Sequence, residues 1–209
     1  MADDPRRVVA RGYDALVDRY LAWTDHSDDE PRMRFLARLA AELPDGADVL
    51  ELGCGAGVPA TARLAQRFRV TGIDISPAQI ARARANVPGA TLMTADATDV
   101  DFPTGSFDAV AAFYVMGHVP RERLGALVAR IGSWLRPGGW LVASFGIGDE
   151  PAWTGDWLGV PMFFSSFPAA VNRRLVQDAG FRVAAEELVT SEEDEQGGVT
   201  FQWILAQRE

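Results

Sequence analysis

Three glycines alternate with small residues directly after a short apolar run, in the segment Glu51-Leu52-Gly53-Cys54-Gly55-Ala56-Gly57. About twenty residues later Asp74 ends a second apolar run, and Asp96 follows at a similar distance. A turn that is nearly bare of side chains lets backbone N–H groups approach a ligand closely. Carboxylates at the ends of neighbouring strands can accept hydrogen bonds from hydroxyl and amino groups. The spacing therefore predicts a pocket the size of a nucleotide.

Alternating strands and helices are expected to position these residues. The hydrophobic pattern predicts strands at residues 48–52, 70–74, 91–94, 109–113 and 140–145, and helices at residues 58–68, 77–86 and 120–135. Ser76 and Gln79 fit the first and last positions of a capping box at the start of the second helix. Such alternation is typical of a parallel sheet with right-handed crossovers. Because the carboxyl ends of parallel strands share one edge, the glycine turn, Asp74 and Asp96 should meet there.

The two ends of the chain depart from this alternation. Two helices are predicted at residues 6–20 and 31–43, and a third at residues 168–179. Residues 181–188 and 199–206 read as strands that are joined by an acidic loop, so they should pair antiparallel. We therefore predict an α/β fold: a doubly wound, Rossmann-like, seven-stranded sheet. It is mostly parallel, has one antiparallel strand near its edge, and carries helices on both faces.

The length of the chain, its apolar runs and its cysteine content indicate how many domains it has and where it is located. Its 209 residues fit one domain, which we divide into a helical cap (1–44), a cofactor-binding core (45–146), a lid (147–167) and a C-terminal helix and hairpin (168–209). No apolar run reaches the roughly 18 residues of a membrane span, and the N-terminus does not resemble a signal peptide. The one cysteine, Cys54, suits a reducing compartment, so we expect the protein in the cytoplasm.

Charge narrows the classes of partner. The formal net charge is −9, which repels a phosphate backbone and disfavours a nucleic acid. Much of this charge lies in the acidic run at residues 191–196, which is expected to be a solvated loop. We therefore expect a small-molecule partner, with neither a nucleic acid nor a membrane. No pattern in the chain predicts an oligomeric state.

Five motifs in combination resemble one family. They are Glu51-Leu52-Gly53-Cys54-Gly55-Ala56-Gly57, Gly72-Ile73-Asp74-Ile75-Ser76, Ala95-Asp96-Ala97, Ser106-Phe107-Asp108-Ala109-Val110 and Leu135-Arg136-Pro137-Gly138-Gly139. The chain resembles the class I S-adenosylmethionine-dependent methyltransferases, in particular the small-molecule branch related to quinone-biosynthesis enzymes. The likeness covers roughly residues 45–146. The helical N-terminus and the hairpin tail also fit the family.

The resemblance implies a role for each matching residue. Glu51 would support the glycine loop near the methionine end of S-adenosylmethionine, Asp74 would bind the ribose and Asp96 the adenine. Ile75 and Ala97 are placed to flank the adenine ring. The other cofactor-binding residues expected are Tyr20, Gly53, Cys54, Gly55, Gly57 and Phe113. Asp108 reads instead as a carboxylate that supports the fold.

The acceptor side is less specific. His118 follows the fourth strand at the rim of the predicted pocket, where it would be a general base or a packing residue. Residues 147–167 are rich in aromatic side chains, including Trp153, Trp157 and Phe163. We expect them, with Tyr13 from the N-terminal helices, to enclose an apolar or aromatic acceptor; the alternative is that they simply pack the helix beneath. His26 reads as a solvated loop residue, and no metal site is predicted.

Three functions remain to be compared. The first is methyl transfer from S-adenosylmethionine to a small, apolar or aromatic metabolite by in-line displacement. The second is a sensor or scaffold that binds the cofactor without turnover. The third is a nicotinamide-dependent oxidoreductase, because Gly55-Ala56-Gly57-Val58-Pro59-Ala60 matches the dinucleotide fingerprint. Glu51, Pro59, Asp96 and the reversed tail disfavour the third function, and we expect the first.

Overall fold

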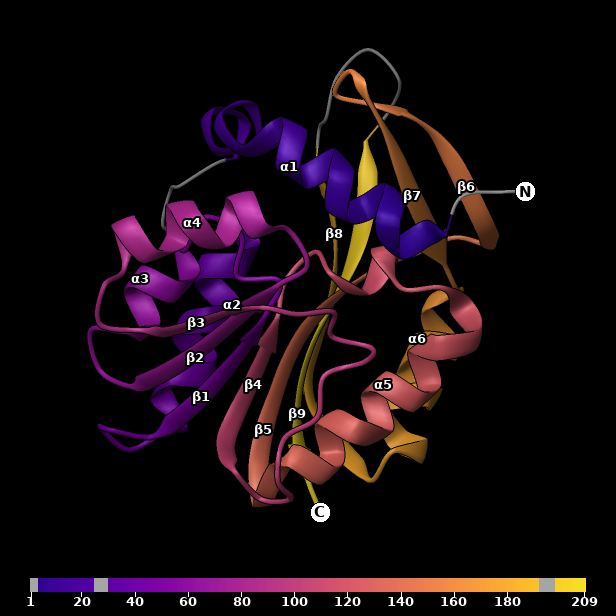
Figure 1. Cartoon of the computed structure of the whole chain (residues 1–209). Coiled ribbons are helices and arrows are strands. Elements are labelled where there is room, and N and C mark those ends of the chain that lie inside the picture. Colours follow the sequence, from indigo (N-terminus) through magenta and orange to yellow (C-terminus); the bar gives the residue numbers. More distant parts are fainter. Residues whose placement is uncertain (1–3, 25–29, 192–197) are drawn as a thin grey trace.

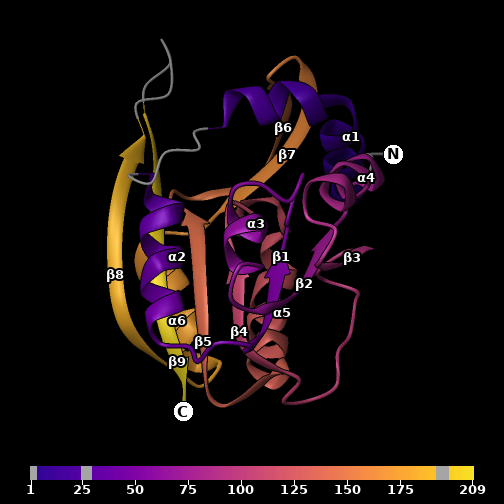
Figure 2. The ribbon, with the colours of Figure 1, turned by 90° about the vertical axis from the view of Figure 1, so that its left-hand side faces the viewer.

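A seven-stranded sheet forms the centre of the computed structural model, which describes residues 4–24, 30–191 and 198–209. His26 and the acidic residues 192–196 lie outside these ranges, so their predicted loops are not described. The strand order is β3-β2-β1-β4-β5-β9-β8 (Figure 2). The bounds are β1 Asp48–Leu52, β2 Arg69–Asp74, β3 Thr91–Thr94, β4 Phe107–Ala112, β5 Leu135–Gly146, β8 Phe181–Ser191 and β9 Val199–Arg208.

Strand directions agree with the predicted fold class. β1, β2, β3, β4 and β5 pair in parallel, whereas β9 is antiparallel to both β5 and β8. The reversed strand therefore lies next to the edge strand β8. The reversal of strand order between β1 and β4 creates the switch point at which ligands bind in such sheets.

Helices cover both faces of the sheet (Figures 1 and 2). On one face lie α2 (Pro31–Ala41), α3 (Ala60–Leu64) and α4 (Pro77–Asn86); on the other lie α5 (Arg121–Trp134) and α6 (Ala169–Asp178). Each face has its own apolar core, built around the buried rings of Phe35 and Trp203 on the first and of Trp134 and Phe145 on the second. None of the described helices is long and apolar enough to cross a membrane.

The helix predicted at residues 58–68 is shorter than expected. α3 contains only five residues, Ala60–Leu64. Pro59 has no N–H to donate and stands just before the helix. After Leu64 the chain closes in tight turns, in which Gln66 N–H donates to Arg63 C=O and Arg67 N–H donates to Leu64 C=O. The glycine turn therefore leads into a compact corner of the chain.

The predicted lid is a regular hairpin and not an irregular segment. β6 (Glu150–Trp157) and β7 (Val160–Ser166) pair antiparallel and form a separate two-stranded sheet. The hairpin lies beside α1 (Pro5–Trp23), which crosses above the carboxyl edge of the main sheet (Figure 1). The two elements pack closely, since a Cβ on Gly12 would lie 2.6 Å from Met162 Cε. α1 and the hairpin together form a layer over that edge.

Candidate functional site

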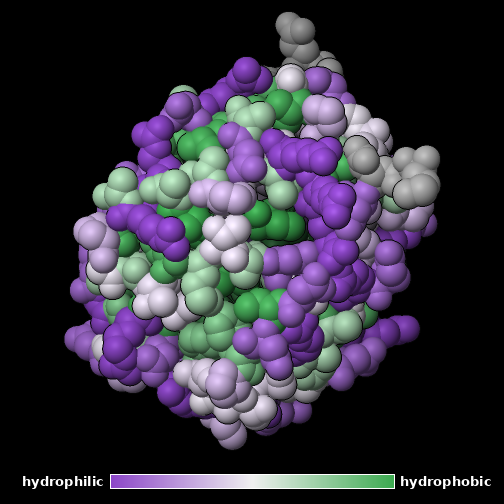
Figure 3. All heavy atoms as spheres, in the orientation of Figure 1, coloured by the Kyte–Doolittle hydropathy of each residue, from purple (hydrophilic) through white to green (hydrophobic). Residues whose placement is uncertain are grey.

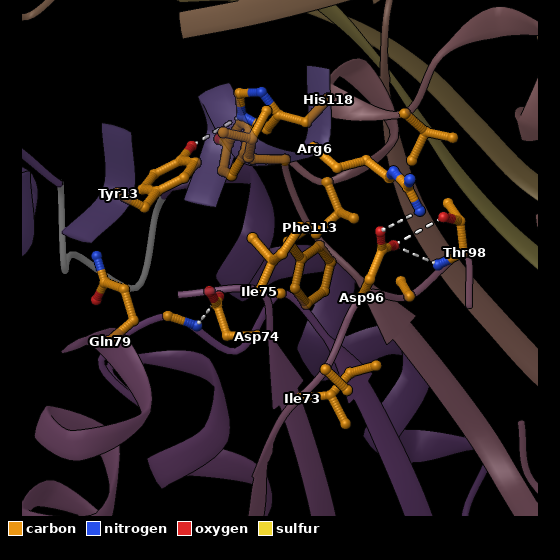
Figure 4. A pocket seen from close by; sticks show the side chains of 18 of the residues that line it. Arg6, Tyr13, Ile73, Asp74, Ile75, Gln79, Asp96, Thr98, Phe113 and His118 are labelled. Carbon is orange, nitrogen blue, oxygen red and sulfur yellow. Dashed lines mark hydrogen bonds and ion pairs between the residues drawn. The ribbon is translucent and has the colours of Figure 1, made fainter. Parts of the chain in front are cut away.

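A cavity opens at the carboxyl edge of the sheet, beneath α1. Its volume is about 750 Å³ when the open space at its mouth is included. Figure 3 shows this face of the molecule, where apolar residues are visible in its middle, below α1. Most of the predicted site residues line this first cavity (Figure 4): Tyr13, Tyr20, Gly53, Gly55, Asp74, Ile75, Asp96, Ala97, Phe113 and His118.

Asp74 connects the end of β2 to the glycine turn. Its Oδ2 accepts the Gly55 N–H at 2.9 Å, and its Oδ1 accepts the Ser76 N–H at 2.9 Å. Burial raises the pKa of Asp74 to about 6, although both N–H groups act in the opposite direction. Any residue other than glycine would be strained at position 53. A Cβ there would lie 2.1 Å from Val115 Cγ2, and the φ of Gly53 is +68°.

Asp96 lies on the far side of the cavity from Asp74 (Figure 4). Its Oδ1 accepts the N–H and the O–H of Thr98 at 2.7 and 2.8 Å. Its Oδ2 lies 3.7 Å from Arg6 Nη1 at the start of α1. One carboxylate oxygen is thus fixed by the loop after β3, and the other faces Arg6 and the cavity.

A second cavity adjoins the first, since Tyr20, Gly53, Gly55 and Phe113 line both. Glu51 and Cys54 also line it. Burial raises the pKa of Glu51 to about 7, and its Oε2 accepts the Thr61 O–H at 2.6 Å. Burial also raises the pKa of the Cys54 thiol, which makes it a poor nucleophile.

His118 and Tyr13 form a hydrogen-bonded pair above the first cavity (Figure 4). His118 Nδ1 lies 2.9 Å from the Phe163 carbonyl oxygen, and that oxygen can only accept. Burial lowers the pKa of His118 to about 4, so the ring is neutral and its proton is assigned to Nδ1. His118 Nε2 therefore accepts the Tyr13 O–H at 2.8 Å. The pKa of Tyr13 is raised well above its usual value by burial, so this phenol keeps its proton.

α1 is held over the cavity by its polar face. Asp14 Oδ1 accepts the Ser76 O–H at 2.6 Å and the Ala78 N–H at 3.1 Å. These bonds attach α1 to the first turn of α4, and they place Tyr13 and Tyr20 against the cavity. The predicted cap at Ser76 is present, because Ser76 Oγ accepts the Gln79 N–H at 3.1 Å.

The comparisons with known proteins find methyltransferases. A family model described as a methyltransferase domain matches residues 49–139. The 27-O-demethylrifamycin SV methyltransferase of Amycolatopsis mediterranei is 35% identical over 153 residues, which cover 63% of this chain and 55% of that protein. The 2-methyl-6-phytyl-1,4-hydroquinone methyltransferase of Synechocystis is 31% identical over 175 residues, with 66% and 54% covered. The chain spans a little over half the length of these curated relatives.

A comparison of folds also finds a methyltransferase, and this match covers a larger part of the chain. The structure of magnesium protoporphyrin IX methyltransferase from Synechocystis, with bound S-adenosylmethionine, matches with a TM-score of 0.76 at 21% identity, and 100% of this chain and 99% of that chain are covered. Residues 49–139 thus match a methyltransferase domain, and the fold of the whole chain is that of a methyltransferase solved with S-adenosylmethionine. Both findings agree with the family that the motifs resemble.

Four of the residues predicted for the site line neither cavity. Gly57, whose φ is +80°, packs against α4, where a Cβ would lie 3.3 Å from Ala83. Phe163 is buried between the hairpin and α1 with its carbonyl toward His118. Trp157 and Trp153 lie on the hairpin and contact the ring of Phe164. Trp153 is 39% exposed. Phe163 and Trp157 contact residues that line the first cavity, whereas the ring partner of Trp153 is Phe164, which lines neither cavity.

An aromatic cluster links the first cavity to the hairpin. Ring centroids lie 5.3 Å apart for Tyr13 and His118, and 6.0 Å apart for Tyr13 and Trp157. Phe164 stacks 4.6 Å from His118 and 5.8 Å from Trp153. Pockets for flat apolar ligands are typically lined in this way. We define the aromatic cluster as Tyr13, Tyr20, Trp23, His118, Trp153, Trp157 and Phe164.

Sequence reasoning missed several polar residues that line the two cavities. Arg6, Gln79 and Thr98 line the first, and Arg32 lines the second. Gln79 is 1% exposed, and neither atom of its side-chain amide has a hydrogen-bond partner. Its place in the sequence is explained by a capping box, but the amide does not complete that box. Such unpaired groups are rare in native proteins and call for an explanation.

The structure also shows the surroundings of Asp108 and of the groups that could bind a metal ion. Asp108 supports the fold, since its Oδ2 accepts the Asp48 N–H at 2.8 Å and lies 2.6 Å from Arg136 Nη1. It lines neither cavity. Within the described residues, no group of three or more His, Cys, Asp or Glu side chains is arranged to hold a metal ion.

Proposed function

We propose that this protein transfers a methyl group from S-adenosylmethionine to a small, apolar or aromatic metabolite. The observation that carries the proposal is the cavity at the switch point, with Asp74 and Asp96 on opposite sides and Gly53 and Gly55 of the glycine turn in its lining. The aromatic cluster beside it supports an apolar or aromatic acceptor. The relatives named above act on dissimilar small molecules, so they do not specify the acceptor.

The residues present fit this cofactor. Asp74 and the unpaired Gln79 amide lie on one side of the cavity, where both hydroxyls of a ribose could be bound. Asp96 Oδ2 could accept from the adenine amino group while Ile75 and Ala97 flank the ring. The proposed binding residues are therefore Glu51, Gly53, Cys54, Gly55, Asp74, Ile75, Asp96, Ala97, Phe113 and Tyr20, to which we add Gln79.

When bound, S-adenosylmethionine supplies an electrophilic methyl group, which an acceptor takes by in-line displacement. The walls of the cavity would orient the acceptor and exclude water, and orientation alone can supply about 7–11 kcal/mol of the barrier reduction in favourable cases. Tyr13 Oη would accept the acceptor's proton while its own proton passes to His118 Nε2. His118 would then carry the positive charge of this proton, and the uncharged phenol of Tyr13 would be restored.

A screen for turnover tests the proposal. The protein is incubated with methyl-labelled S-adenosylmethionine and a panel of small phenols, alcohols, amines and metabolite extracts. We expect label in an organic product and one S-adenosylhomocysteine for each methyl transferred. Binding of S-adenosylhomocysteine without turnover on any acceptor would favour the sensor. Calorimetric binding of NADH in its place would contradict the cofactor assignment.

Replacing Gln79 by methionine should separate its effect on binding from its effect on stability. Methionine has nearly the same volume but forms no hydrogen bonds to a ribose, so we expect S-adenosylhomocysteine to bind about tenfold more weakly. The unbound protein should melt at the same or a higher temperature, because a buried unpaired amide has been removed. Calorimetry and thermal melts measure both quantities. Gln66→Met, at an exposed position, is the matched control. A lower melting temperature with unchanged affinity would contradict this role.

Binding of S-adenosylhomocysteine should depend on pH through Asp74 and Glu51. Their raised pKa values, about 6 and about 7, mean that both carboxyls take up protons as the pH falls below neutrality. A ribose hydroxyl and an ammonium group prefer the ionised carboxylates, so affinity should fall at least about tenfold from pH 8 to pH 5. His118, with a pKa of about 4, stays neutral over this range. Glu51→Gln should make the profile shallower, and a flat wild-type profile would contradict the prediction.

Other expectations stay predictions. They are the single domain over residues 1–209 with its division at 44, 146 and 167, and a location in the cytoplasm. A small-molecule acceptor and the lack of a nucleic-acid or membrane partner also belong here. Size-exclusion chromatography of the purified chain would determine its oligomeric state.

A further inference from the structure

His118 is the last residue of a turn that cannot orient the imidazole by itself. This turn, η1 (Met116–His118), is one turn of 3₁₀ helix between β4 and α5. The His118 N–H donates to the Val115 C=O at 2.9 Å. The next bond, from the Val119 N–H to the Met116 C=O, is longer at 3.3 Å. Because hydrogen-bond geometry in such short turns is poor, the direction of the His118 ring depends on contacts with other elements.

The hairpin supplies these contacts through β7. This strand pairs with β6 along one edge, and its residues also bond to the segment that begins at His118. The bonds join the Phe163 C=O to His118 Nδ1–H at 2.9 Å, Ser165 Oγ–H to the Val119 C=O at 2.7 Å, and the Ser166 C=O to Arg121 Nε–H at 2.8 Å. They follow the same order along both segments, so β7 and residues 118–121 lie side by side in one fixed register.

The Phe163 carbonyl decides which nitrogen of His118 carries the proton. A carbonyl oxygen only accepts, so the proton lies on Nδ1 and the lone pair is left on Nε2, 2.8 Å from the Tyr13 hydroxyl. The Phe164 ring also stacks on the imidazole, with centroids 4.6 Å apart. Successive residues of a strand face opposite ways, so a shift of β7 by one residue would turn the carbonyl and the ring away from His118. The proton relay therefore needs this register.

The bond from Ser165 to Val119 fixes the register from inside the protein. Both residues are 5% exposed. Each lies close in sequence to a group of the relay, since Val119 follows His118 and Ser165 lies two residues after Phe163. A buried carbonyl that loses its donor has no water to replace it, so this bond disfavours other registers. Arg121 reinforces the alignment at the end of β7.

We propose that Ser165 is a positioning residue for the proton relay, because it holds β7 in the register in which the Phe163 carbonyl keeps the His118 proton on Nδ1. This inference rests on the proposed function, in which the acceptor's proton passes to Tyr13 Oη and the Tyr13 proton passes to His118 Nε2. The His118 ring is then cationic, and its Nδ1–H bond to the Phe163 carbonyl becomes stronger. Ser165 itself neither gains nor loses a proton. The hairpin thus orients the relay and is not only a cover over the acceptor.

Nitrogen NMR of histidine-labelled protein tests the tautomer without any acceptor. The chain has two histidines, His26 and His118, so His118→Ala assigns the signals. In the wild type at pH 7, we expect a neutral His118 ring with a protonated Nδ1 and an unprotonated Nε2. Ser165→Ala should move a measurable fraction of the rings to the tautomer with the proton on Nε2. Ser133→Ala is the matched control, because the Ser133 hydroxyl also donates to a carbonyl at 2.7 Å, that of Arg130, and Ser133 lines neither cavity.

Turnover measures the consequence for catalysis. With an acceptor found in the screen, Ser165→Ala should lower kcat about tenfold, less than the loss of the base itself, and change the affinity for S-adenosylhomocysteine less than about twofold. Ser165→Thr keeps the hydroxyl, so it should restore the wild-type tautomer and most of kcat. If Ser165→Ala does not fold, Arg121→Met carries the test. It removes the bond to the Ser166 carbonyl and should change the tautomer and kcat in the same direction.

A Ser165→Ala variant that keeps either the wild-type tautomer or the wild-type kcat would overturn the role of Ser165. So would a wild-type His118 that carries its proton on Nε2, or equal losses in Ser133→Ala. A wild type that does not bind S-adenosylhomocysteine, or that transfers a methyl group to no acceptor, would instead overturn the proposed function, and this inference with it.

Discussion

Asp74→Ala is expected to weaken the binding of S-adenosylhomocysteine by about 100-fold or more. The carboxylate has two roles in the first cavity: it would accept both ribose hydroxyls, and it already accepts the N–H groups of Gly55 and Ser76. Hydrogen bonds to a charged group each contribute about 1.5–3 kcal/mol, so the loss of two such bonds predicts this magnitude. Isothermal titration calorimetry at pH 8, where Asp74 is ionised, measures the affinity directly.

Two comparisons isolate the contribution of the carboxylate to ligand binding. Asp74→Asn keeps one carbonyl oxygen for the glycine turn, so it should fold like the wild type and still bind weakly. Asp45→Ala removes an exposed carboxylate that pairs with Arg67 and lines neither cavity, and it should leave the affinity unchanged. An Asp74→Ala variant that binds with wild-type affinity would contradict the placement of the ribose.

The positions of the acids were predictable because they follow from local patterns and one global rule. Asp74 and Asp96 end or follow apolar runs of strand length, and parallel strands present their carboxyl ends at one edge. The structure indeed places both side chains on the wall of one cavity with Gly53 and Gly55. The reversed strand β9 was predictable for a similar reason, since the loop before it is too short for a crossover helix.

The hairpin could not be predicted in this way. β6 and β7 are joined by Leu158 and Gly159, which both have positive φ values of +52° and +78°. Two-residue hairpin loops of this kind are normally marked by Asn-Gly or Asp-Gly, and leucine at the first position hides the signal. The aromatic residues of the segment also face both α1 and solvent, so no clean alternation of apolar and polar residues appears along the strands.

Arg32 and Gln79 were missed for a different reason, because each already had a local explanation. Gln79 fitted a capping box, whose side-chain half is not formed. Arg32 precedes Leu36 by one helical turn and lies on the same buried face of α2. An arginine on an apolar stripe is a usable signal, since charged residues are almost never fully buried unless they are paired. Its guanidinium lies over the Tyr114 ring, and it lines the second cavity together with Glu51; neither relation can be read from the local sequence.

Removing either partner of the Tyr13 and His118 pair should lower kcat by about 100-fold to 10,000-fold, the range for losing general acid–base catalysis. Tyr13→Phe deletes the hydroxyl that would take the acceptor's proton, and His118→Ala deletes the nitrogen that accepts the Tyr13 proton. Neither change removes a proposed contact to the cofactor. The affinity for S-adenosylhomocysteine should therefore stay within about threefold, while turnover of an acceptor found in the screen falls.

The double variant distinguishes a proton relay from two independent contacts. Residues that act as one unit show strongly non-additive losses, so Tyr13→Phe with His118→Ala should be no slower than the worse single variant. The relay also requires a neutral imidazole, and the pKa of His118, about 4, keeps it neutral at every pH above about 5. Activity of the wild type should therefore show no loss from His118 protonation between pH 5 and pH 8. Full turnover by Tyr13→Phe on a hydroxyl acceptor would assign His118 to packing, because a relay without the phenol has no path for the proton.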